Sequence, residues 1–232
     1  MARMTATDLV SEIRLHLGGE TSETVSDTQI LRWINRSYIE LASAYDFHEL
    51  ETSTSITTSS GTAEYAAPTT GADDVLSVLS IIDDTNNQTI YPWSRWQYDQ
   101  ATQGNSSTIT GVPTHWFVSG VGDNSDSPAK TVKQYTFYPT PAGTYTLNMI
   151  YKKIPTELVL SPSATSSILP QAWDDAMLLR AVSRGWRALG DDDKSYKALL
   201  AARDSERAAM ESSFVSSWVP FRPGSIVGGA LR

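Results

Sequence analysis

Helical periodicity is clear near the C-terminal end of the chain, across residues 170–213. Apolar side chains such as Leu178, Val182 and Trp186 recur three and four positions apart in the first half of this stretch, which is typical of an amphipathic helix. Gly190 is placed to end that helix, and the aspartates after it can cap a second one. The pattern therefore predicts two helices joined by a tight turn.

The second of these helices carries a stripe of small side chains that includes Ala198, Ala202 and Ala209. Small residues let a neighbouring helix approach closely, while larger residues beside them fill the groove. Two interpretations stay open at this point. The stripe either closes a helical hairpin within one core or packs against copies of the same chain.

Three arginines, Arg180, Arg184 and Arg187, fall on one face of the first helix of this pair. One interpretation is a solvated face whose charges are balanced by nearby acids such as Asp191. The other is a docking stripe for an acidic partner surface, because guanidinium groups bind carboxylates through paired hydrogen bonds.

Two more amphipathic helices are predicted at the N-terminal end. Leu9, Val10 and Ile13 begin the apolar face of the first. The second opens with Ser26 and Gln29, the residue types and spacing of a capping box. Together with the C-terminal pair, these helices would each bury one apolar face, and a single bundle is the simplest way to do so.

Between the two helical regions the period of the pattern changes from helical to alternating. Residues 132–138 and 144–154 read as a hairpin, and β-branched residues are frequent elsewhere in the region. The predicted class is α+β, a four-helix bundle with an inserted antiparallel β subdomain and an extended C-terminal arm. The expected boundaries are 1–47 and 159–213 for the bundle, 48–158 for the β subdomain and 214–232 for the arm.

The arm is apolar but contains prolines and glycines that prevent a continued helix. We expect it to be disordered in a free monomer and ordered on a partner, since an apolar tail that cannot fold locally usually binds another surface. Its candidate binding residues are Phe214, Trp218, Phe221, Ile226, Val227 and Leu231.

Composition narrows the possible functions. The 232 residues include no cysteine, which excludes disulfides and thiolate chemistry. Their net charge is −8, which argues against a general nucleic-acid binder. No stretch approaches the roughly 20 apolar residues of a membrane span, and no signal-peptide pattern opens the chain. We therefore expect a protein without a membrane partner, made in a cytoplasm.

No motif of catalysis or cofactor binding is present in the sequence. His16, His48 and His115 are isolated from one another, so neither a metal site nor a cofactor is expected. Paired aspartates occur at turns and helix starts, where acids are common in any case. The chain is therefore predicted not to be an enzyme.

Three tryptophans in the β region, Trp93, Trp96 and Trp116, raise an alternative from another class. Exposed indole rings can stack on sugars, although aromatic residues in a β subdomain more often lie in its core. The alternative function is therefore a carbohydrate-binding or tail-fibre module that uses surface tryptophans.

The order of several phrases resembles a known family. The phrases are EYAAP, GVPTHWFV and TFYPTPAGTYTLNMIYKKIP, set between two N-terminal and two C-terminal helices. This order resembles the head-to-tail adaptor (connector) proteins of tailed bacteriophages, in particular those of short-tailed phages. The resemblance covers nearly the whole chain.

The resemblance implies a structural virion protein at the head–tail junction. Copies of it would form a ring, a dodecamer by family analogy, that joins the portal protein to the tail or nozzle proteins. Double-stranded DNA would pass through the lumen without specific binding, and the C-terminal arm would reach the portal. The negative net charge suits a channel wall along which DNA slides.

Overall fold

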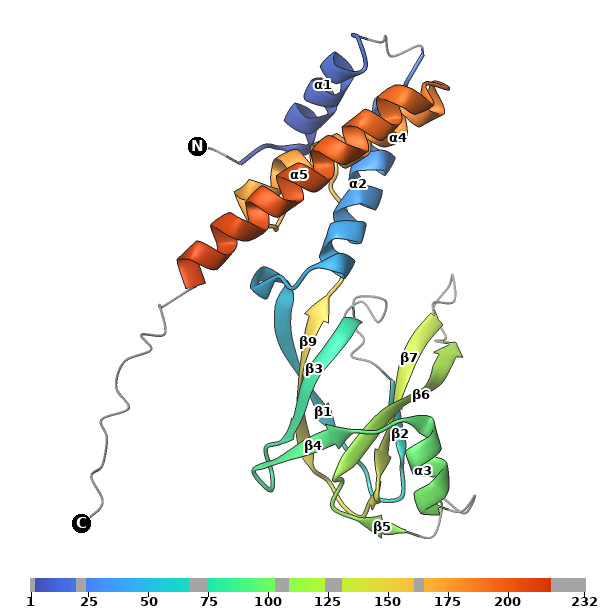
Figure 1. The fold of residues 1–232 in the computed structure, drawn as a ribbon. Coiled ribbons are helices and arrows are strands. Elements are labelled where there is room, and N and C mark those ends of the chain that lie inside the picture. Colours follow the sequence, from blue (N-terminus) through green and yellow to red (C-terminus); the bar gives the residue numbers. More distant parts are fainter. Residues whose placement is uncertain are drawn as a thin grey trace, which may run out of the picture. The chain divides into compact units, whose positions relative to one another are not determined.

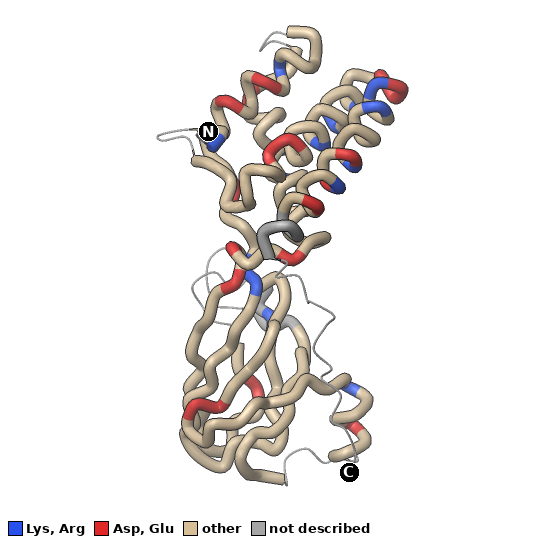
Figure 2. The backbone as a smooth tube through the Cα atoms, turned by 60° about the vertical axis from the view of Figure 1, so that its left-hand side comes forward, with Lys and Arg blue, Asp and Glu red and all other residues tan. Residues whose placement is uncertain are grey.

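The chain folds into two compact units, Met1–Leu41 with Glu157–Arg232, and Ala42–Thr156. The structure is a computed structural model that describes residues 3–19, 24–66, 75–102, 109–123, 131–160 and 165–217. Figure 1 shows the strands together with one short helix in one unit and the longer helices in the other. Figure 2 shows charged positions spread along the helices and sparse along the strands.

The described elements correct the predicted fold class. They comprise five α-helices, a seven-stranded mixed sheet and a second sheet of two short strands. The prediction of a four-helix bundle with an inserted antiparallel β subdomain was therefore wrong. The four predicted helices are present, but a fifth lies in the β unit, and the sheet is a major part of the molecule.

Two helices begin the first unit, and each has a side-chain cap at its start. Helix α1 spans Ala6–His16, and the Thr5 hydroxyl and Asp8 carboxylate form a reciprocal capping box at its start. Helix α2 spans Asp27–Ala44. At its start the Gln29 amide donates to the Ser26 hydroxyl oxygen over 3.3 Å.

The C-terminal helices form the predicted hairpin. A short 3₁₀ turn, Gln171–Trp173, leads into α4, Asp174–Ala188, and α5 spans Asp192–Ser217. Gly190 between them has a φ of +83°, a left-handed conformation that glycine adopts without steric cost. The side chain of Asp191 then accepts from the Lys194 amide at 2.9 Å and caps α5.

Packing in the helical unit explains why it is not a regular bundle. Helices α4 and α5 make the most extensive contact, and α1 packs on α4. The segment that leads from residue 157 to α4, the connector, is bonded to α2. The Asn35 side chain bonds both backbone groups of Leu158, at 3.1 and 2.8 Å. The Tyr38 hydroxyl accepts from the Ile168 amide at 2.7 Å. Part of α2 is thus bonded to connector residues rather than to another helix.

The strands of the β unit are arranged in the order β1-β9-β3-β4-β6-β7-β2, with β5 and β8 forming the second sheet. A 3₁₀ turn, His48–Leu50, precedes the first strand. The bounds are β1 Glu51–Thr57, β2 Glu64–Ala66, β3 Val75–Asp83, β4 Gln88–Pro92, β5 Thr110–Gly111, β6 His115–Asp123, β7 Thr131–Tyr138, β8 Thr140–Pro141 and β9 Thr146–Lys153.

The sheet is mixed rather than antiparallel because of one crossover. After β4 the chain forms helix α3, Arg95–Thr102, and later enters β6 parallel to β4, with Tyr91 opposite His115. Parallel neighbours need such a crossover, whereas antiparallel ones can be joined by a hairpin. Strands β5 and β8 are also parallel. The predicted hairpin of residues 132–138 with residues 144–154 is also wrong. Strand β7 pairs with β6 and β2, whereas β9 pairs with β1 and β3.

The core of the β unit lies on the inner face of this sheet. Alternate positions of β9 contribute to it, with Leu147 and Met149 fully buried. They belong to one cluster with Ile81, Ile90 and Phe137 from β3, β4 and β7. This period-2 alternation was visible in the sequence of β9. Burial of these side chains gives the unit a hydrophobic core of its own.

Candidate functional site

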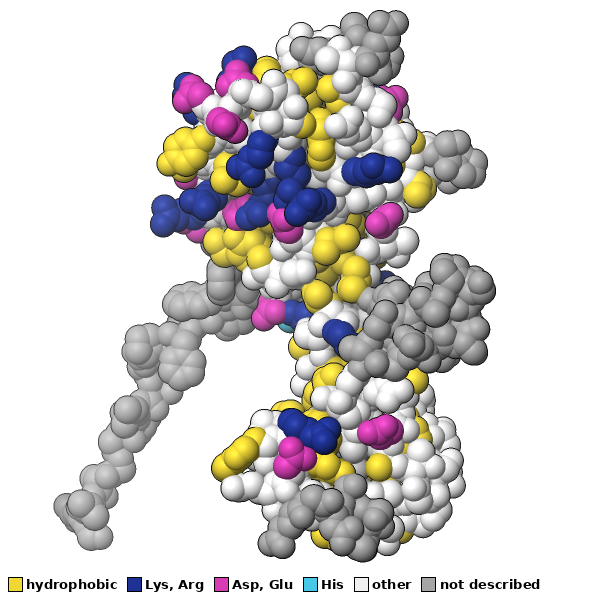
Figure 3. Space-filling view, turned by 90° about the vertical axis from the view of Figure 1, so that its right-hand side faces the viewer, with side chains coloured by type: hydrophobic (Ala, Val, Ile, Leu, Met, Phe, Trp, Pro, Cys, Tyr) yellow, Lys and Arg dark blue, Asp and Glu magenta, His cyan; other side chains and the backbone are white. Residues whose placement is uncertain are grey.

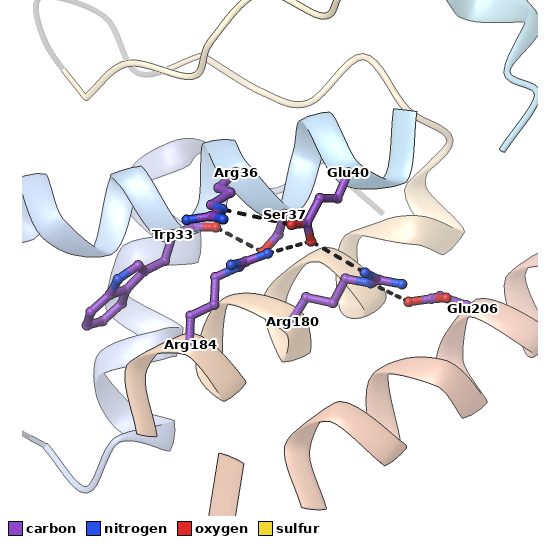
Figure 4. A network of polar contacts seen from close by, with 7 residues as sticks. All are labelled: Trp33, Arg36, Ser37, Glu40, Arg180, Arg184 and Glu206. Atoms are coloured by element: carbon purple, nitrogen blue, oxygen red, sulfur yellow. Dashed lines mark hydrogen bonds and ion pairs between the residues drawn. The ribbon is translucent and has the colours of Figure 1, made fainter. Parts of the chain in front are cut away.

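The helical unit contains a polar network that joins three helices (Figure 4). Glu40 of α2 accepts ion pairs from Arg180 of α4, at 3.5 Å, and from Arg184 of the same helix. Arg180 also pairs with Glu206 of α5. Two of the arginines predicted as a docking stripe therefore bind acids of their own chain.

Burial makes the Arg180–Glu206 pair the most constrained part of this network. The Glu206 side chain is only 5% exposed and that of Arg180 is 22% exposed. A carboxylate removed from water is stable only when it is paired. The pair therefore fixes α5 against α4, and Arg180 extends this restraint to α2 through Glu40.

A second contact of the network joins Arg184 of α4 to the backbone of α2 through a hydroxyl group. Its Nε donates to the Ser37 hydroxyl at 3.3 Å, and this hydroxyl in turn donates to the Trp33 carbonyl at 2.9 Å. On the solvent side of Glu40, Arg36 lies 3.9 Å away across one helical turn. The third predicted stripe residue, Arg187, is exposed.

The small side chains of α5 face α4. Ala202 and Ala209 are buried at 0% and 2% exposure, while Ala198 is half-buried. Between them in the same stripe lies Glu206, and Ala208 on the neighbouring side of the helix is exposed. The burial pattern shows that part of the stripe is used within the hairpin.

A glycine sets how closely α1 and α2 approach α4. A Cβ on Gly185 would stand 2.8 and 2.9 Å from the two methyl carbons of Leu17 and 3.2 Å from Cζ3 of Trp33. Carbon atoms normally pack about 3.5–4.0 Å apart. The missing side chain at this position therefore makes room for Leu17.

Two open hollows lie on the helical unit. One, of about 380 Å³, is lined by Arg32, Asn35, Arg36, Ile39, Glu40 and Glu157. The other, of about 590 Å³, lies along α1 and is lined by Thr7, Val10, Ser11, Arg14, Leu15, Gly19, Asp27 and Leu160. Arg14 and Asp27 in the second hollow are paired with each other.

Catalytic and metal-binding arrangements do not emerge from the described part of the chain. Within it, no three His, Cys, Asp or Glu side chains gather closely enough to hold a metal ion. Most acids of the helical network are occupied by arginines. The arrangement can fix helices and offer charged surfaces, which is the chemistry of an interaction protein.

One buried acid lies at the start of α4. Burial raises the pKa of Asp174 to about 6, although a hydrogen bond from Ser167 and the charge of Arg3 act in the opposite direction. Arg3 also donates to the Ser167 carbonyl at 3.0 Å. This group ties the N-terminal segment to the connector that precedes α4.

The three tryptophans of the alternative hypothesis lie in different environments. Trp116 belongs to the core of the sheet and is 9% exposed. Trp93 stacks on His115 with ring centroids 3.9 Å apart. Trp96, in α3, is 66% exposed. Trp116 is thus removed from any shared surface with Trp96.

The predicted C-terminal arm lies almost wholly outside the described residues. Helix α5 continues to Ser217, so the backbone of Phe214 is helical. The remaining candidate arm residues fall after that point and outside the described ranges: Trp218, Phe221, Ile226, Val227 and Leu231.

Sequence reasoning missed the acids that complete the network, Glu40 and Glu206. A signal was present for Glu206, because it is a charged residue within a stripe of alanines, and such a position requires a partner once the stripe is buried. For Glu40 the spacing from Arg36 suggested only a surface pair. Gly185 within a helical pattern was a further signal of close packing.

Comparison with known proteins identifies one family. A family model described as SU10 adaptor protein matches residues 4–220, and so covers both units. No match was found among curated proteins. Of the helices in the described ranges, none has the combined length and hydrophobicity needed to cross a bilayer.

Proposed function

The chain belongs to the SU10 adaptor protein family, and we propose that it is a head-to-tail adaptor whose copies form a ring between the portal and the tail. Family membership supports a bacteriophage adaptor role and a location in the virion. The ring, the extension of the DNA channel and the binding of the portal are parts of the proposal. Its main support is the match over residues 4–220.

The helical unit is suited to a position in which a subunit must resist deformation. Its three-helix ion-pair network and the close approach at Gly185 restrain α1, α2, α4 and α5 against one another. A ring that holds packaged DNA needs subunits that do not deform. Charge supports the same role, because a net charge of −8 disfavours binding of DNA that must pass through the lumen.

We assign attachment to the portal to residues 214–232. Each of the six large apolar side chains of this arm contributes roughly 1.5–3 kcal/mol when buried. Ordering the backbone costs about 1–2 kcal/mol per residue, so the side chains alone do not hold the segment. Main-chain hydrogen bonds to the portal supply the remainder, and the arms of a ring act together.

Deletion of the arm tests this assignment. A chain truncated after Ser217 loses five of the six candidate arm residues, all except Phe214. It keeps all of helix α5, so the far-UV circular dichroism spectrum should match that of the full chain. Stable binding to a portal ring in a pull-down should be lost. Undiminished binding by the truncated chain would refute the assignment while leaving the adaptor role in place.

The proposal also excludes catalysis. The purified chain should not hydrolyse peptidoglycan or other glycans, and reproducible hydrolysis that disappears on changing one carboxylate would contradict it. The central experiment combines the purified full chain with the portal ring of the same phage, followed by electron microscopy. A second ring on one end of the portal is expected. Failure of the full chain to bind the portal ring would refute the proposed function.

A further inference from the structure

The helical unit exposes two ridges that match in spacing and oppose in charge. On α1 the ridge consists of Asp8, Glu12 and Leu15, and on α2 of Arg32, Arg36 and Ile39. Both have spacings of four and three residues, which place three side chains along one helix face. Two acids and a leucine on one helix thus correspond to two arginines and an isoleucine on the other.

The acidic ridge is exposed to solvent in the part of the chain that the structure describes. Leu15 is 75% exposed, an unusual position for a large apolar side chain beside the hollow on α1. Asp8 and Glu12 are exposed as well. Asp8 caps α1, and hydrogen bonds from Thr5 hold the pKa of its carboxyl below the usual value. This ridge is therefore negatively charged with an apolar end.

The basic ridge borders a hollow that is open to solvent. Arg32 and Arg36 are exposed, and with Ile39 they line the hollow of about 380 Å³. Glu40 in this hollow is neutralised by Arg184 and Arg180. Figure 3 shows a face of the same unit on which Lys and Arg side chains gather. The hollow has room for a leucine side chain.

We propose that the α1 ridge of one copy binds the α2 ridge of the next, an inference that rests on the proposed ring. Contacts between two different patches of identical subunits are the kind that generate rings. Charge complementarity identifies the occupant as a second copy, because each ridge finds its opposite on the same chain. Glu12 and Arg36 are the middle residues, and when the two helices run parallel each acid faces an arginine. Leu15 then enters the hollow.

Reciprocal charge reversal tests the pairing. Full chains with Glu12→Arg, with Arg36→Glu and with both changes are mixed with portal rings, and assembled rings are counted by electron microscopy. Like charges placed opposite each other disfavour association strongly, so each single variant should assemble at least about tenfold less than wild type. The double variant restores opposite charges and should recover most of the assembly.

Controls separate the interface from the fold and from the proposed function. Each variant should keep the wild-type urea midpoint, because surface ion pairs such as Arg36–Glu40 contribute little to stability. Glu64→Arg, an exposed site on β2, should assemble normally. Full assembly by both single variants, or no recovery in a folded double variant, overturns the interface while the adaptor role stands. Absence of rings with the wild-type chain overturns both.

Discussion

Replacing Gly185 with alanine should destabilise the helical unit, although alanine is the better helix former. At an exposed helical site alanine is favoured over glycine by about 0.8–1.0 kcal/mol. At this site the new methyl group would lie 2.8 and 2.9 Å from the Leu17 methyl carbons and 3.2 Å from Trp33. Leu17 is 1% exposed and has little free space into which to turn.

Overpacking of this kind costs about 1–3 kcal/mol, which exceeds the gain in helix propensity at the upper end of its range. Subtracting that gain leaves an expected net loss for Gly185→Ala of roughly 0–2 kcal/mol. Urea unfolding followed by circular dichroism at 222 nm measures it, since this signal comes mainly from the helical unit. The matched control is Ala188→Gly at an exposed site of α4, which reports the propensity difference without a clash.

A double-mutant cycle with Leu17 tests the cause. Leu17→Ala alone should cost about 2–5 kcal/mol because it leaves a cavity. In the double variant Gly185→Ala with Leu17→Ala, the methyl group on residue 185 partly fills that cavity. The double variant should therefore lose less stability than the sum of the two single losses. A stabilisation of about 1 kcal/mol by Gly185→Ala alone would refute the reasoning.

Three further predictions concern other parts of the helical unit. Asp174 has a pKa raised to about 6 from 3.8, so it destabilises the folded chain above that pH and the penalty disappears as the pH falls towards 4. Asp174→Asn should therefore raise the urea midpoint at pH 7, which corresponds to a gain of up to about 3 kcal/mol in the free energy of unfolding. The midpoint should then change less between pH 7 and pH 4 than in the wild type. An unchanged pH profile would contradict this. Arg180→Met leaves Glu206 buried without its closest partner and should cost roughly 3 kcal/mol, and adding Glu206→Leu should recover most of the loss in the same unfolding assay. Ala202→Leu should cost about 1–3 kcal/mol, whereas Ala208→Leu at an exposed site should change stability by less than about 0.5 kcal/mol; equal losses in the two variants would mean that the burial of the stripe is not the cause.

Local signals in the sequence predicted the elements well. Ser26 and Gly190 indicated a helix start and a helix end, because caps depend on the few residues around them. The alternation at Leu147 and Met149 identified a strand with one buried face for the same reason. Adaptor-family membership, expected from the order of the phrases, was confirmed.

Long-range arrangement was beyond the sequence. The parallel pairing of Tyr91 with His115 depends on how the chain returns after α3, and alternation of residues is the same in parallel and antiparallel strands. Asn35 bonds a connector residue 123 positions away, and no local pattern encodes that partner. The partners of Arg180 could not be predicted for the same reason. An arginine that faces solvent and one that pairs with an acid occupy the same positions in a helical sequence pattern.

The separation of bonded residues along the chain has a consequence for the order of folding. Contacts of the α4–α5 hairpin are local: Ser183 and Ser195 are 12 positions apart, and Arg180 and Glu206 are 26 apart. Contacts of α2 with the connector span 123 and 130 positions, across the whole β unit. Because closing a long loop costs more entropy, short-range contacts form faster. During synthesis the N-terminal helices emerge first, yet their apolar faces find partners only when the last quarter of the chain has appeared.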